Sequence, residues 1–179
     1  MKNKSILWPI LTIVLAAILL FAAALGLSGI GAANAQAEYL EIMRTLLPGS
    51  ENFTVEPYAG EDANILAVHK GETGFVIETV TQGYAGQITM LVGVSTDGHV
   101  TGLQVRDMAE TFGLGAEALT DHVFLSQFLN TSGESEVGTN VDAITGATVT
   151  SKAIARCVNS AVAYVTGADI SSGATTWGE

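Results

Sequence analysis

Cysteine is almost absent from this sequence: its 179 residues include one, Cys157. A disulfide within the chain, a zinc site built on cysteines and an iron–sulfur cluster held by this chain alone are therefore excluded. Basic residues are also scarce, with seven Lys and Arg against eighteen Asp and Glu, for a net charge of −11. A chain so acidic repels the phosphate backbone, which excludes nucleic acid as a partner.

Charged residues are missing altogether from residues 5–37. Within this stretch, residues 7–27 read LWPILTIVLAAILLFAAALGL, and a helix of that length spans about 30 Å, the thickness of the hydrocarbon layer of a membrane. Lys2 and Lys4 precede the run, and every acidic residue follows it. The positive-inside rule then predicts a cytoplasmic stub at 1–6, a transmembrane helix at 7–27 and the rest of the chain on the extracytoplasmic side of the cell membrane.

A cleaved signal peptide is the alternative interpretation, because residues 33–35 (Ala-Asn-Ala) have the form of a cleavage site. The apolar core of a signal peptide is usually shorter than this run, which favours a retained anchor. The two interpretations stay open at this stage, and both export the rest of the chain.

The acidic remainder is long enough to bury a core of its own. We expect a juxtamembrane linker and helix over 28–50, a folded domain over 51–166 and a flexible tail over 167–179. Apolar residues at helical spacing predict the juxtamembrane helix at 38–47, ended by Pro48 and Gly49. Residues 51–61 are polar and rich in turn formers.

Strand signals follow one another without a long helix between them, so the sequence predicts an α+β domain with a largely antiparallel sheet and flanking helices. The predicted strands are Ile65–Lys70, Gly74–Thr81, Ile88–Ser95 and Val100–Arg106. Asp97-Gly98 is a strong hairpin signal between the last two. Helices are predicted near 121–129 and over 150–165, the latter with an apolar stripe.

The segment 142–151, which reads DAITGATVTS, precedes the last predicted helix. Its residues predict a turn at Gly146, followed by a helix capped by Thr150 or Ser151. Small side chains and the N–H groups of a helix start favour an anion, so the segment could hold a phosphate. An ordinary capped helix is the alternative, and the segment lacks the lysine and second glycine of a P-loop.

The pattern D-x-x-T-G-A-T before a helix resembles the flavinylation motif of the FMN-binding domain family. That family includes the G subunit of the Rnf electron-transfer complex and its relative, the C subunit of the sodium-pumping NADH:quinone reductase. The resemblance extends to the N-terminal span, to residues 74–79 and 83–88, and to the loop 110–115, which reads ETFGLG. The short chain favours the Rnf protein.

The resemblance implies that FMN is joined covalently, through its phosphate, to the hydroxyl of Thr148. A separate flavin transferase would make this bond, with FAD as donor and a divalent metal. The FMN site implied by the resemblance also includes Asp142, Thr145, Gly146, Ala147, Thr150 and Ser151 of the motif and Glu110, Thr111, Gly113 and Leu114 of the loop. Met108 and Phe112 stand where the family loop often carries histidine and proline.

The implied function is that of a membrane-anchored flavoprotein, the G subunit of an ion-translocating ferredoxin:NAD⁺ oxidoreductase. It would carry electrons between the membrane subunits that hold other flavins and iron–sulfur centres, rather than act as an enzyme alone. One alternative is a stand-alone exported FMN-binding protein for extracellular electron transfer. The other is a structural anchor domain in which the motif occurs by chance.

Two further patterns predict no site. His69, His99 and His122 are scattered singly, so no metal site is expected. Residues 169–175 repeat the spacing D-x-x-[ST]-G-A-T, but only four residues follow Thr175. A helix cannot form there, so we expect one flavin, on Thr148, with Thr175 modified at most in a minor fraction.

Overall fold

The computed structural model describes residues 4–108 and 120–168. The chain divides into two compact units, Met1–Glu41 and Ile42–Glu179. Helix α1 (Lys4–Leu46) forms the first unit and ends within the second. The helices predicted at 7–27 and 38–47, the second as a continuation of the first out of the membrane, are parts of one helix, because the glycines between them weaken a helix without ending it. Among the described residues, no helix has both the length and the hydropathy needed to cross a membrane.

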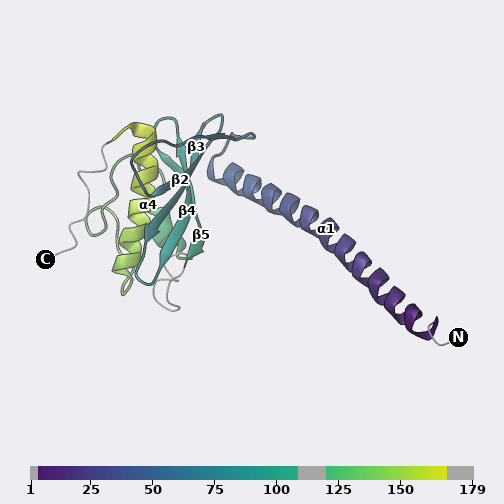
Figure 1. Ribbon diagram of the computed structural model, residues 1–179. Coiled ribbons are helices and arrows are strands. Elements are labelled where there is room, and N and C mark those ends of the chain that lie inside the picture. The colour runs from purple at the N-terminus through teal and green to yellow at the C-terminus, as the bar shows by residue number, and fades with distance from the viewer. Residues whose placement is uncertain (1–3, 109–119, 169–179) are drawn as a thin grey trace. The chain divides into compact units, whose positions relative to one another are not determined.

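Five antiparallel strands form the sheet of the second unit, in the order β1-β2-β3-β4-β5 (Figure 1). They are β1 (Thr54–Glu56), β2 (Ile65–Lys70), β3 (Gly74–Gln82), β4 (Gln87–Ser95) and β5 (Val100–Met108). The predicted antiparallel sheet and α+β class are confirmed. Strand β1 was missed, because it lies in the polar segment 51–61 and is held by pairing with β2 rather than by its own composition.

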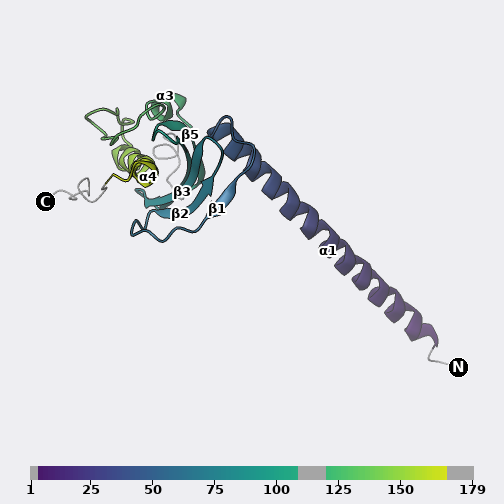
Figure 2. The same cartoon turned by 90° about the horizontal axis from the view of Figure 1, so that it is seen from above.

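The main core lies between the sheet and α4 (Thr148–Thr166), which covers one face of it, as Figure 2 shows. A short helix, α3 (His122–Ser126), adds Phe124 at the edge of this core. Fully buried side chains of the strands, such as Ile77 and Met90, belong to the same cluster as Ile154 on α4. Cys157 also lies here, and burial raises the pKa of its thiol to about 11, so it is a neutral core residue at physiological pH.

The other face of the sheet receives the end of α1. Gly93 and Gly102 are cross-strand partners on β4 and β5, and neighbouring Val92 points into the main core, so Gly93 faces the opposite side. A Cβ on Gly93 would meet the backbone carbonyl oxygen of Leu46, and one on Gly102 would lie 2.9 Å from the Leu46 Cα. The hydroxyl of Thr101 donates to that same carbonyl at 2.5 Å. The glycine pair therefore lets the end of α1 pack directly on the strand backbone.

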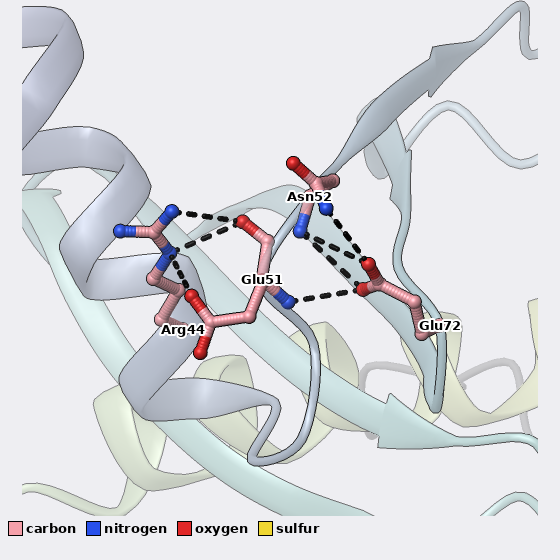
Figure 3. Close-up of polar contacts among 4 residues, drawn as sticks. All are labelled: Arg44, Glu51, Asn52 and Glu72. Carbon is pink, nitrogen blue, oxygen red and sulfur yellow. Dashed lines mark hydrogen bonds and ion pairs between the residues drawn. The ribbon is translucent and has the colours of Figure 1, made fainter.

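Polar contacts tie the turn after α1 to the β2–β3 hairpin (Figure 3). The guanidinium of Arg44 donates to the carbonyl oxygen of Glu51 at 3.0 and 3.1 Å. The carboxylate of Glu72 accepts from the backbone N–H of Glu51 at 3.0 Å and from the side-chain amide of Asn52 at 3.1 Å. These hydrogen bonds lower the pKa of the Glu72 carboxyl, and the largest contribution comes from the Asn52 side chain. Residues 42–52 are thus an integral part of the second unit.

Candidate functional site

Helix α4 begins at Thr148, two residues earlier than predicted. Ala147 occupies its N-cap position and makes no side-chain capping bond. The prediction that Thr150 or Ser151 caps the helix is therefore wrong. Both side chains lie within the first turn and are buried, with 1% and 0% of their surface exposed. Helix propensity alone could not show this, because three hydroxyl residues lie close together at the helix start and each is an acceptable cap.

Ser151 instead closes the loop that precedes the helix. Its Oγ accepts a hydrogen bond from the backbone N–H of Ile144 at 3.2 Å and donates to the carbonyl oxygen of Ala147 at 2.9 Å. The N–H of Ala147 also donates to the carbonyl of Ile144 at 2.9 Å, which completes a four-residue turn. Gly146 holds the third position of this turn with φ of +81°, the left-handed conformation that a type II turn requires and that favours glycine.

The hydroxyl-bearing surface of this turn faces solvent. Thr148, Thr145 and Gly146 are exposed, as is Asp142 at the start of the motif, whereas Ala147 is buried. Thr148 therefore presents its side chain at the first position of a 19-residue helix. Because the N-cap residue Ala147 makes no side-chain capping bond and the first turn of α4 contains no acidic residue, the helix start suits an anion carried on the Thr148 hydroxyl. These residues fit an attached phosphate.

Gln127 is a residue of this site that the sequence did not reveal. Its side-chain oxygen accepts from the backbone N–H of Asp142 at 2.8 Å, and its side-chain nitrogen donates to the carbonyl oxygen of Asp142 at 3.3 Å. Gln127 lies fifteen residues before Asp142, just after α3, and no local pattern links the two.

Two contacts show how α4 runs relative to the sheet. The rings of Tyr164 and Phe75 lie 5.6 Å apart near the start of β3, and the guanidinium of Arg156 donates to the carbonyl of Gln82 at the end of that strand at 3.2 Å. Helix α4 is therefore antiparallel to β3. The N-terminal end of α4 therefore lies toward the end of the sheet where β3 leads into β4.

Strand β5 ends at that same end of the sheet, because Met108 pairs with Ile88 near the start of β4. The predicted loop follows Met108. Its candidate residues Glu110, Thr111, Gly113 and Leu114 lie outside the described residues. Among those that are described, no three His, Cys, Asp or Glu side chains come together as ligands for a metal ion.

Comparison with known proteins places this geometry in a family. Residues 83–163 match the family model of the FMN-binding domain, a span that includes the turn at residues 144–147 and most of α4. The G subunit of the ion-translocating oxidoreductase complex of Methanosarcina acetivorans is 36% identical over 141 residues, which cover 70% of this chain and 73% of that protein. The chain belongs to the family of the G subunits of ion-translocating oxidoreductase complexes.

Other proteins are similar over shorter stretches or at lower identity. The G subunit of the Na⁺-translocating ferredoxin:NAD⁺ oxidoreductase complex of Acetobacterium woodii is 39% identical over 100 residues, and the match covers 50% of this chain and 47% of that protein. The crystal structure of NqrC from Shewanella oneidensis is similar with a TM-score of 0.46 and 20% identity, over 70% of this chain and 73% of that one.

Proposed function

We propose that this protein is a membrane-anchored electron carrier of an ion-translocating ferredoxin:NAD⁺ oxidoreductase complex, with FMN joined covalently to Thr148. The observation that carries the proposal is that Thr148 is exposed at the start of α4, after an N-cap residue that makes no side-chain bond, inside the region that matches the FMN-binding domain. The partners are the membrane subunits of the complex, which hold flavin and iron–sulfur centres. Maturation requires a flavin transferase.

The attachment step uses Thr148 as the nucleophile. Its Oγ forms a bond to the phosphorus on the riboflavin side of FAD, the pyrophosphate bond breaks, and AMP leaves while the hydroxyl proton passes to a base of the transferase. The phosphodiester retains one negative charge, which the N–H groups and dipole of the α4 N-terminus stabilise. Thr145 in the turn and Asp142 before it are exposed. The buried Ser151 side chain stabilises the turn through its hydrogen bonds to Ile144 and Ala147.

Bound FMN supplies the redox chemistry, since it exchanges one or two electrons with its partners. The chain itself fixes the position of that group. We also propose that Glu110, Thr111, Gly113 and Leu114 of the segment 110–115 contact the flavin. Thr150, also predicted to belong to the site, is buried in the first turn of α4.

Intact mass of the purified protein tests the proposal directly. Co-expression with a flavin transferase should add one FMN less one water to the chain, and expression without the transferase should not. A mass gain together with co-purification of the membrane subunits supports the complex. A mass gain without these subunits supports the stand-alone exported flavoprotein, and no gain in mass supports the structural anchor domain and contradicts the proposed function.

The acceptor turn predicts a separate effect of Gly146→Ala. Alanine in the left-handed region costs about 1–2 kcal/mol, and relieving that strain would change the turn that presents Thr148. We expect slower flavin attachment in a time course followed by in-gel flavin fluorescence, together with a lower melting temperature. Gly138→Ala is the matched control, because Gly138 has φ of +94° in the preceding loop. Equal attachment rates in the two variants would contradict this role of Gly146.

The membrane anchor is proposed from residues 7–27, with the N-terminus in the cytoplasm. A reporter that is active only after export, fused after Glu179, should be active, and the full chain should stay in the membrane fraction after a carbonate wash. Activity of a reporter that works only in the cytoplasm would contradict the orientation. A mature protein that begins at Gln36 and appears in the soluble fraction would support the cleaved signal peptide instead.

A further inference from the structure

The loop that leads to the proposed acceptor Thr148 covers residues 142–147, and hydrogen bonds hold its backbone at three places. The turn bond between Ala147 and Ile144 and the two bonds of the Ser151 side chain come from the motif itself. The third comes from a different segment, since Gln127 binds both the N–H and the carbonyl of Asp142. Without it, the exposed start of the loop would exchange these bonds for bonds to water.

Gln127 is itself firmly placed. Phe124 and Phe128, on either side of it in the sequence, have 2% and 0% of their surface exposed, and their rings pack edge to face at 5.3 Å. Two backbone bonds of 2.9 Å further join Asn130 and Thr131 to Val100 at the start of β5. Gln127 is thus half-buried in a segment that packs in the core, and this packing fixes the position of its amide beside the loop.

We infer that Gln127 is a positioning residue for flavin attachment: by holding Asp142 it fixes where the Thr148 hydroxyl stands when the transferase engages the loop. The inference rests on the proposed function. The physical reason is that the hydroxyl oxygen must approach the phosphorus of FAD in a defined geometry. A small displacement of this nucleophile lowers the rate of flavin transfer steeply. Gln127 touches neither the hydroxyl nor the flavin donor and acts through the backbone.

A second amide clamp, meaning a side-chain amide that bonds both the N–H and the carbonyl of one loop residue, lies in the same domain and provides the control. The side chain of Asn159 accepts from the N–H of Ser135 at 2.8 Å and donates to the Ser135 carbonyl at 3.0 Å. The two clamps share the same chemistry, but Ser135 lies outside the motif. Loss of either removes two hydrogen bonds from a loop backbone, and because Ser135 is buried whereas Asp142 is exposed, loss of the Asn159 pair should lower stability at least as much.

The experiment compares Gln127→Met, Gln127→Glu and Asn159→Leu in the full chain, with purified transferase and FAD. We expect Gln127→Met to lower kcat/KM for flavin attachment about tenfold. Gln127→Glu, which keeps the acceptor for the Asp142 N–H, should restore part of the rate. Asn159→Leu should attach flavin at the wild-type rate despite a fall in melting temperature that is at least as large.

Two results would overturn the inference while leaving the proposed function intact: a wild-type rate in Gln127→Met, or an equal loss of rate in Asn159→Leu. A wild-type protein that takes no flavin would refute the proposed function and this inference together. Hydrogen exchange of the wild-type Asp142 amide is an independent measurement should a variant fail to fold. Slow exchange at this exposed residue is expected, and exchange as fast as in unstructured peptide would contradict the clamp.

Discussion

Thr148→Val should abolish covalent flavin while leaving the domain folded. The substitution removes the only atom of this side chain that can bond to phosphorus and retains its β-branched shape. Since Thr148 is exposed and does not cap α4, the change in unfolding free energy should be within about 0.5 kcal/mol, as for other surface substitutions. In-gel fluorescence and intact mass after co-expression with the transferase measure the flavin, and thermal denaturation measures the fold.

Thr139→Val is the control for this result. Thr139 is an exposed threonine of the loop that precedes the motif, and the variant should keep a full complement of flavin. A flavin that persists in Thr148→Val would refute Thr148 as the acceptor. Peptide mapping would then show whether Thr175, in the repeated pattern of the tail, had taken its place.

The largest loss of stability is expected from Gly93→Ala. Its new methyl group would meet the carbonyl oxygen of Leu46, which is backbone and cannot rotate away, so the end of α1 must shift on the sheet. That shift would weaken the Thr101 bond and the burial of Leu47, which is fully buried. We expect a loss of about 2–3 kcal/mol, typical of overpacking in a core, measured by urea denaturation of the domain.

Gly133→Ala tests whether the effect belongs to this contact. A Cβ on Gly133 meets nothing within 4 Å, so the substitution should be neutral or slightly stabilising through the unfolded state. Equal stability of Gly93→Ala and the wild type would show that the end of α1 does not rest on the glycine pair. A shorter chain that begins after Leu47 should then fold as well as one that begins at Ile42.

The strands β2 to β5 could be predicted from the sequence within one or two residues at each end. Their alternation of apolar residues and the Asp97-Gly98 turn are local signals, and consecutive strands joined by short turns can only pair antiparallel. Strand β1 could not, because its pairing with β2 supplies a stability that its three residues lack. The observed start of α4 differs from the predicted one for a related reason. Ser151 bonds the loop before the helix and does not cap the helix.

The D-x-x-T-G-A-T motif, its glycine turn and the presence of a helix after it were determined by the sequence alone, because all three depend on neighbouring residues. Two features depended on the tertiary structure. The packing of the end of α1 on Gly93 and Gly102 requires that β4 and β5 pair at those residues and that a helix from a distant part of the sequence packs there. The amide of Gln127 reaches Asp142 because Phe124 and Phe128 pack in the same core cluster as Val141, which precedes Asp142. A hydrogen bond across fifteen residues leaves no local trace, since its partners are chosen by where the core places the backbone.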